Sequence, residues 1–162
     1  MAKVVTLGEI MLRLSPPGYE RFAQASRFDV NYGGAEANVA ASLAQLGNNA
    51  AFLSKIPANA IGDAAIATLK SLGVNCQYIA RGGKRLGIYY LESGSAMRPS
   101  KVVYDRAHSS ISTATEQEFD FDAIFADADW FHFTGITPAI SDSAAELTEK
   151  ALIAARKHGV KV

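Results

Sequence analysis

The sequence has few of the features that mark several large classes of protein. Cys76 is the only cysteine among 162 residues, so no internal disulfide can form, which favours a reducing compartment such as the cytoplasm. The 16 lysines and arginines balance 16 aspartates and glutamates, so no excess charge attracts nucleic acid or a membrane surface. No apolar run approaches the ~20 residues of a membrane span. Because Glu9 and Arg13 interrupt the first apolar stretch, we expect no signal peptide and a cytoplasmic protein.

Common catalytic and nucleotide-binding motifs are also missing. The first expected strand leads into "LGEIMLRL" with a single glycine, whereas a dinucleotide fold needs G-x-G-x-x-G there. Neither the phosphate-binding G-x-x-x-x-G-K-[ST] loop nor the G-x-S-x-G elbow of hydrolases occurs. Three scattered histidines and one cysteine give no zinc-ligand spacing, so we expect no metal site.

The first part of the chain alternates between expected strands and helices. Apolar residues 4–10 predict a buried strand, and residues 49–56 predict another. A helical period begins at Ala35 and stops at Gly47, and a second helix is expected over 61–72. This alternation is typical of a parallel sheet with helical crossovers.

The alternation breaks in the middle of the chain. A half-buried strand and three short strands are expected over 28–32, 77–79, 86–92 and 101–105. An antiparallel insertion does not fit within a parallel sheet. We therefore expect a small separate β-layer, with its strands within 12–32 and 76–106.

The crossover pattern resumes near residue 121. Residues 121–127 predict a helix, "WFHFTG" predicts a strand, and residues 142–157 predict a helix followed by "VKV". A strand at this place in a parallel sheet is normally central and followed by another helix. We therefore expect residues 1–162 to form one unit that is truncated after its N-terminal part.

Two adjacent glycines, Gly33 and Gly34, precede the helix expected at Ala35. Free N–H groups at a helix N-terminus favour oxygen ligands, and Asn38 can both donate and accept hydrogen bonds, as sugar hydroxyls require. A plain turn between a strand and a helix would also account for the glycines. Taken alone, the pair is more typical of that turn.

The stretch "GGAEANVAASLAQLG" resembles the first motif of the PfkB (ribokinase-like) sugar kinases, with two glycines, a small residue and an asparagine before a helix that ends in glycine. More narrowly, the chain is similar to the 2-keto-3-deoxygluconate kinases. The stretches that carry this similarity are "TLGEIMLRLSPP", "NYGGAEANVA", "GIYYLE", "PSKVVYDRAHSS" and "WFHFTGITPA". One departure is "KIPANAIGD", where many PfkB kinases have Gly-Asp/Glu-Asp, so the detailed form of that turn is open.

The resemblance implies a fold and a reaction. The fold is a doubly wound α/β domain with a parallel sheet and a small antiparallel β-sheet lid over the sugar. The reaction transfers the γ-phosphoryl group of ATP, with Mg²⁺, to the terminal hydroxyl of a sugar acid. In the family the catalytic aspartate lies in a Gly-Ala-Gly-Asp motif of the C-terminal half, and this motif does not occur here. We therefore expect no catalytic residue within 1–162, ATP and Mg²⁺ bound mainly by the missing half, and no activity of the chain alone.

The resemblance also implies which residues contact the substrate. Tyrosines on the expected lid strands offer a sugar a flat face and a hydroxyl, although they could instead pack the lid on the main domain. A guanidinium grips a carboxylate with two parallel hydrogen bonds, although an arginine after a strand is usually a surface charge. Parallel sheets open their ligand crevice where strands end, as in "TGIT". The expected substrate contacts are Gly33, Gly34, Asn38, Tyr89, Tyr104, Arg106 and Ile136.

Other polar residues are weaker candidates. Glu9 is expected near the same crevice, either orienting its neighbours or as a buried structural carboxylate. Arg98 and Lys101 are interpreted as surface charges. His132 is interpreted as a core or edge residue, and His158 as a cation suited to a helix C-terminus.

Two other functions remain open. One is a kinase of the same fold that acts on a neutral sugar such as fructose or ribose. The other is a non-catalytic sugar-binding module. In either case the small-molecule ligand is a sugar, and family analogy implies a homodimer formed through the lid.

Overall fold

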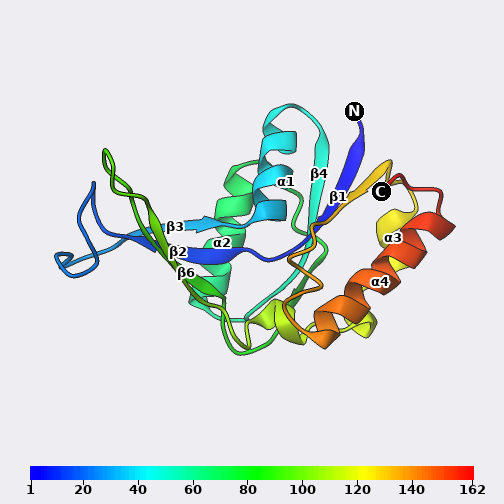
Figure 1. Cartoon of the computed structure of the whole chain (residues 1–162). Coiled ribbons are helices and arrows are strands. Elements are labelled where there is room, and N and C mark those ends of the chain that lie inside the picture. Colours follow the sequence, from blue (N-terminus) through cyan, green and yellow to red (C-terminus); the bar gives the residue numbers. More distant parts are fainter.

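The computed structural model describes all 162 residues, which form two sheets and the helices that cover one of them (Figure 1). The elements are β1 (Lys3–Leu7), β2 (Met11–Ser15), β3 (Asp29–Gly33), α1 (Ala35–Gln45), β4 (Asn49–Ile56), α2 (Ala60–Ser71), β5 (Ile79–Arg81), β6 (Ile88–Glu92), β7 (Lys101–Asp105), the 3₁₀ helices η1 (Ser110–Thr113) and η2 (Glu116–Glu118), α3 (Phe121–Phe125), β8 (Trp130–His132) and α4 (Asp142–Lys157). No helix has the length and apolar composition that crossing a membrane requires.

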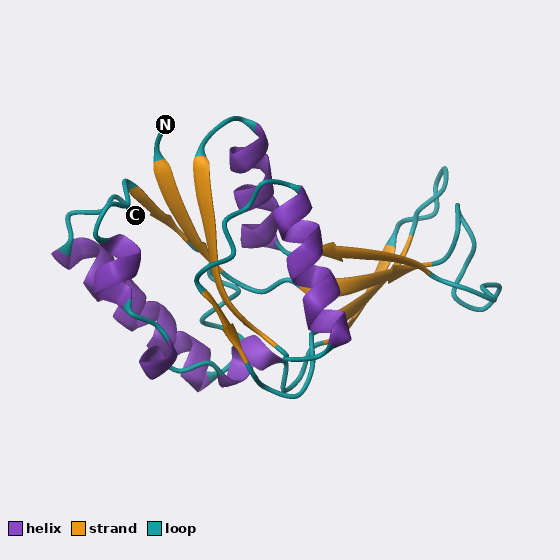
Figure 2. Ribbon diagram, turned by 180° about the vertical axis from the view of Figure 1, so that it is seen from behind, coloured by secondary structure: helices purple, strands orange, loops and turns teal.

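The larger sheet is parallel and has the strand order β5-β4-β1-β8. Helices α1 and α2 lie on one face and α3 and α4 on the other (Figures 1 and 2). Successive side chains of β4 point to opposite faces of the sheet, as in any strand. Ala51 and Leu53 join the core under α4, whereas Phe52 and Ile56 join the core under α1 and α2. This is the doubly wound α/β architecture that was expected.

The smaller sheet, called the lid below, has the strand order β3-β2-β6-β7 and projects away from the helices (Figure 2). The pairs β2–β3 and β6–β7 are antiparallel, but β2 and β6 run parallel. The expectation of a wholly antiparallel lid was therefore wrong. Each antiparallel pair comes from consecutive strands, and the two inner strands then lie side by side in the same direction.

Three local expectations also need correction. The strand near 77–79, expected in the small β-layer, is β5, which pairs with β4 in the larger sheet because it completes the crossover through α2. Strand β3 was expected to be half-buried, yet Val30 is 57 % exposed, because β3 is an edge strand of the projecting lid. The expected "VKV" strand is a single bridge between Lys161 and Trp130.

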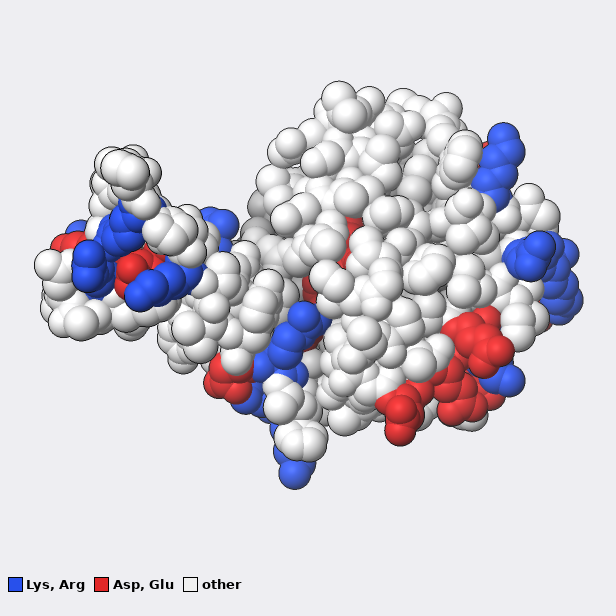
Figure 3. All heavy atoms as spheres, in the orientation of Figure 1, with Lys and Arg blue, Asp and Glu red and all other residues white.

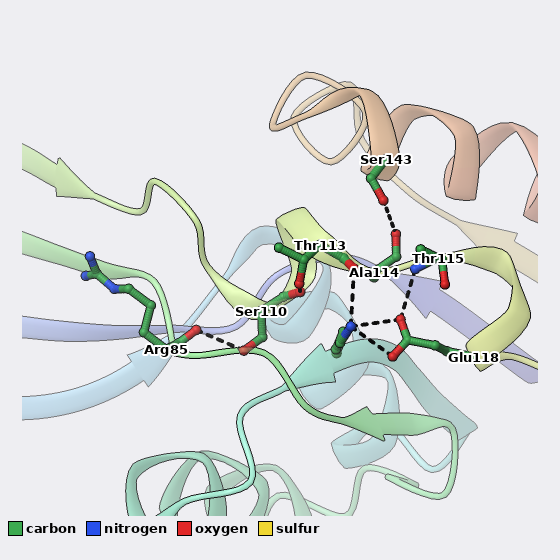
Figure 4. A network of polar contacts seen from close by, with 8 residues as sticks. Arg85, Ser110, Thr113, Ala114, Thr115, Glu118 and Ser143 are labelled. Atoms are coloured by element: carbon green, nitrogen blue, oxygen red, sulfur yellow. Dashed lines mark hydrogen bonds and ion pairs between the residues drawn. The ribbon is translucent and has the colours of Figure 1, made fainter.

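A polar network fixes the base of the lid to the main domain (Figure 4). The Ser110 hydroxyl of η1 donates to the carbonyl of Arg85 at 3.0 Å, just before β6. The Lys55 ammonium of β4 donates to the carbonyl of Thr113 in η1 at 3.2 Å and to Glu118 of η2 at 2.9 Å. These contacts hold η1 in place, and with it the short segment after β7 that carries Arg106.

Candidate functional site

A cleft of about 200 Å³ lies where the lid meets the first turn of α1 and the segment after β8. Acidic atoms lie deep in a hollow near the middle of the face shown in Figure 3, with basic atoms beside them. The lining residues are Glu9, Met11, Gly34, Ala35, Glu36, Asn38, Tyr89, Tyr104, Arg106, Ile136 and Thr137. The cleft therefore gathers six of the seven residues expected from the sequence, and the seventh, Gly33, is not among its lining residues.

The glycine pair has a structural reason that involves the chain itself. A Cβ on Gly34 would lie 1.8 Å from the carbonyl oxygen of Glu9, so only glycine fits at this N-cap of α1. A Cβ on Gly33 would lie 3.4 Å from Asn38 Oδ1 and 3.7 Å from the Tyr89 hydroxyl, which is ordinary contact at the edge of the cleft. The group that comes close to Gly34 is thus the backbone carbonyl of Glu9, as expected if the glycines serve a turn between a strand and a helix.

Two tyrosines from neighbouring lid strands form one wall of the cleft. Tyr89 of β6 pairs with Tyr104 of β7, and their ring centroids are 6.0 Å apart. Tyr90 points to the opposite face, where its ring lies 6.0 Å from that of Phe28. Tyr104 is 59 % exposed, so its ring is open to a ligand.

Arg106 is placed at the cleft, but its guanidinium is already engaged. Its Nη2 donates to Glu9 Oε2 in an ion pair, and its guanidinium carbon lies 5.7 Å from the centre of the Tyr104 ring. Its Nε is buried without a partner. The sequence predicts an arginine free to grip a carboxylate with two hydrogen bonds, whereas in the structure one donor serves Glu9.

Glu9 is both buried and in contact with a neighbour that it can orient. It is 5 % exposed, and its Oε1 has no hydrogen-bond partner. A Cβ on Gly87 would lie 2.4 Å from that oxygen, so the glycine makes room for it. Burial raises the pKa of Glu9 above its ordinary value, and the positive charge of Arg106 opposes that rise.

A second buried carboxylate lines the cleft and was not predicted as a site residue. Glu36, in the first turn of α1, is 2 % exposed and accepts a hydrogen bond from the Thr134 hydroxyl. A Cβ on Gly8 would lie 2.1 Å from Glu36 Oε2. The only sequence signal was an acidic residue at a helix N-terminus, which is common on general grounds.

Met11 and Thr137 were also missed as cleft residues. Met11 begins β2 and pairs with Gly33, a long-range contact that has no local signal. Thr137 is 1 % exposed, and its hydroxyl has no partner. It belongs to the "TGIT" stretch, as does Ile136, whose side chain is 52 % exposed at the cleft.

The remaining candidates lie outside the cleft. Arg98 donates to the carbonyls of Tyr19 and Ser93 at 2.7 and 3.1 Å, so this surface charge also joins two lid loops. His158 ends α4 and lies 2.7 Å from Asp122. That contact and Lys157 hold the pKa of the Asp122 carboxyl below its ordinary value.

The cleft residues do not fit a metal ion or a triphosphate. The structure contains no group of three or more His, Cys, Asp or Glu side chains that could hold a metal ion. Arg106 is the only cation lining the cleft, and two carboxylates, Glu9 and Glu36, line it too. A polyanion would meet more negative than positive charge there.

Comparisons with known proteins agree with this fold. The chain is 41% identical over 158 residues to the 2-dehydro-3-deoxygalactonokinase of Haloferax volcanii, covering 98% of this chain and 49% of that protein. It is 33% identical over 146 residues to the 2-dehydro-3-deoxygluconokinase of Bacillus subtilis, covering 89% of this chain and 44% of that protein. The chain thus spans about half the length of these relatives.

Solved structures match as well. The 2-dehydro-3-deoxygluconokinase of Thermotoga maritima superposes with a TM-score of 0.97 at 57% identity, over 99% of this chain and 49% of that one. A PfkB family carbohydrate kinase of Listeria grayi gives 0.95 at 38% identity, over 98% and 50%. The sequence pattern of the pfkB family carbohydrate kinases matches residues 1–162. Because this match runs through the whole chain, the chain belongs to the pfkB family of carbohydrate kinases.

Proposed function

We propose that the cleft holds a 2-keto-3-deoxy sugar acid, such as 2-keto-3-deoxygluconate, and that the whole protein transfers a phosphoryl group from ATP to the terminal hydroxyl of that acid. The observation that carries the proposal is the placement of Arg106 between the cleft tyrosines and Glu9. A guanidinium beside aromatic rings is suited to a ligand with a carboxylate at one end and hydroxyls along its length. The names of the relatives from Haloferax volcanii and Bacillus subtilis point to the same class of sugar acid.

Each side chain of the cleft has a chemical role in this proposal. Arg106 binds the carboxylate, and the hydroxyls of Tyr89 and Tyr104 hydrogen-bond the hydroxyls of the sugar. The Asn38 amide, near the N-terminus of α1, donates to a further hydroxyl, and Ile136 covers an apolar edge. For phosphoryl transfer such positioning is a large part of catalysis.

We infer that ATP and Mg²⁺ are held mainly outside these 162 residues. The relatives are about twice as long as this chain, and the cleft does not fit a triphosphate. Neither buried carboxylate is assigned as the base that accepts the hydroxyl proton, because Glu9 pairs with Arg106 and Glu36 with Thr134. On this inference the 162 residues alone bind the sugar acid and do not phosphorylate it.

Removal of the guanidinium tests the proposed substrate. In the whole protein, Arg106→Ala should lower kcat/KM for 2-keto-3-deoxygluconate by about 100-fold, because two charge-assisted hydrogen bonds contribute about 3 kcal/mol. The value for fructose should change less than fivefold. Arg81→Ala is a matched control, because Arg81 pairs with Asp63 outside the cleft. Equal losses for the acid and the neutral sugar would contradict the proposed role of Arg106.

A kinase for a neutral sugar is the second candidate. The ion pair between Arg106 and Glu9 favours it, because that pair leaves the cleft without a free cation. Fructose or ribose would then be phosphorylated faster than the acid. Arg106→Ala would change kcat/KM by a similar factor for the acid and for the neutral sugar. Calorimetry of the sugar acid without ATP separates binding from transfer, and binding with no turnover by the whole protein would indicate a sugar-binding module.

We also propose that two copies associate through their lids. All five residues of β7 are exposed, and Val102 and Val103 are 46 % and 52 % exposed. An open edge strand with apolar side chains is a natural pairing surface. Val103→Lys should convert a dimer to a monomer in analytical ultracentrifugation, whereas Ile153→Lys, at an exposed position of α4, should not. A dimer that persists in Val103→Lys would place the interface elsewhere.

A further inference from the structure

The charges around the cleft are unbalanced for a ligand that is itself an anion. Glu9 and Glu36 are both buried there, and Arg106 is the only cation that lines the cleft. A bound sugar acid would place a third carboxylate next to a single guanidinium. Beside two buried carboxylates this excess of negative charge is costly, and a proton taken up by one of them would relieve it.

Glu9 is the group placed to supply that compensation. Its Oε2 accepts from Arg106, while its Oε1 is buried and unpaired. The buried Ser109 hydroxyl lies near the same carboxylate. Arg106 and Arg85 act on Glu9 as positive charges and Glu36 as a negative one. The cleft tyrosines add hydroxyls on the lid side. Glu36, by contrast, already has the Thr134 hydroxyl as its partner.

We propose that Glu9 is an internal counter-ion that holds Arg106 in the free protein and takes up one proton when a sugar acid binds. The substrate carboxylate replaces Glu9 Oε2 as the acceptor for Nη2 of Arg106. A proton from solvent bonds to Oε1 of Glu9, and no other covalent bond changes. Burial already raises the pKa of Glu9 while Arg106 is its partner, and loss of that partner raises it further. The inference rests on the proposed function, because it takes a sugar acid as the ligand.

This exchange gives acids and neutral sugars different pH dependence. When one proton is taken up, the Kd of the acid rises about tenfold for each unit of pH. A neutral sugar does not compete for Arg106, so its Kd should stay flat. Glu9 is thus a positioning residue that acts through Arg106. Its effect is measured as the number of protons that the protein takes up when the acid binds.

Isothermal titration calorimetry of the whole protein with 2-keto-3-deoxygluconate, without ATP, measures that count. Titrations at pH 7.5 in phosphate and in Tris differ in heat according to the number of protons taken up. We expect about one proton for the unchanged protein and none for Glu9→Gln, with a Kd that no longer depends on pH. Glu92→Gln is the matched control, because Glu92 is 3 % exposed on β6 and pairs with Arg98 away from the cleft. It should keep the uptake.

The outcomes separate the two proposals. Binding of the acid without proton uptake overturns the exchange and leaves the proposed substrate standing. Uptake that persists in Glu9→Gln, or that is lost in Glu92→Gln, also overturns the assignment to Glu9. No binding of the acid overturns the proposed function and this inference together. The buffer comparison on the unchanged protein decides the question even where Glu9→Gln fails to fold.

Discussion

The ion pair between Arg106 and Glu9 gives a sharp prediction for stability. Arg106→Ala leaves Glu9, which is 5 % exposed, without the positive charge that opposes the effect of burial. Removing one partner of a buried pair costs roughly 3–5 kcal/mol. We therefore expect Arg106→Ala to lower the free energy of unfolding strongly at neutral pH.

Protonation of Glu9 limits this cost and makes it depend on pH. An unfolded glutamate has a pKa of about 4.3, and each pH unit above it adds about 1.4 kcal/mol to the cost of protonation. The loss in Arg106→Ala is therefore at most about 4.5 kcal/mol at pH 7.5 and about 1.7 kcal/mol at pH 5.5. The sign follows from linkage: a carboxyl whose pKa is raised by folding contributes stability at low pH, and this contribution is lost as the pH rises through the raised pKa.

Urea unfolding at the two pH values, followed by circular dichroism, measures the effect. Arg81→Ala should lose less than about 1 kcal/mol at both, because its pair with Asp63 is largely solvated. The double variant Arg106→Ala/Glu9→Gln should recover most of the loss at pH 7.5, because no buried charge remains. A loss in Arg106→Ala that is the same at pH 5.5 and 7.5 would refute the reasoning, since it would show that Glu9 takes up no proton when its partner is removed.

Three further predictions follow from the same region and from the core. Gly34→Ala should destabilise the protein by about 3 kcal/mol or more in urea unfolding, because its Cβ would overlap the backbone, whereas Gly135→Ala, with no atom within 4 Å, should change it by less than about 0.5 kcal/mol. Burial raises the pKa of the Cys76 thiol, so iodoacetamide at pH 8 should alkylate it more slowly than free cysteine, with the difference lost in urea. Tyr104→Ala should lower kcat/KM for acid and neutral sugars by a similar factor of about 10, and a loss confined to the acid would contradict its role as a sugar wall.

Local signals were enough to predict much of the fold. The helix expected over 142–157 is α4, because Ser141 caps its first turn by accepting from the backbone N–H of Ala144 at 3.1 Å. Gly159, with φ of 71°, follows the end of α4, where a left-handed backbone conformation favours glycine. The strand β4 was likewise predicted to the residue, because its apolar run is bounded by turn residues.

Features that depend on distant pairing could not be predicted in the same way. Strand β5 has three residues, too few for a period, and only its contacts with β4 place it in the larger sheet. Glu9 and Arg106 are 97 residues apart, so the sequence identifies each as a candidate but not their ion pair. The resemblance to a family predicted that the expected substrate contacts share one site, and six of them line the cleft. Only the structure shows that two buried carboxylates lie beside Arg106 in the cleft.

The cleft joins two parts of the molecule that are held in different ways. At its floor the backbones of Glu9 and Gly34 are in direct contact. Arg106 lies just before η1, which is anchored by hydrogen bonds to the carbonyl of Arg85. Its tyrosine wall belongs to the projecting lid, whose edge strand β7 is exposed throughout. On the proposed function, the group that distinguishes an acid from a neutral sugar lies at the anchored base, whereas the tyrosines that any sugar would contact lie on the exposed lid. Because the ion pair links Arg106 to the floor, the proposed function predicts that selection for an acid depends on the exchange of one carboxylate for another at this point.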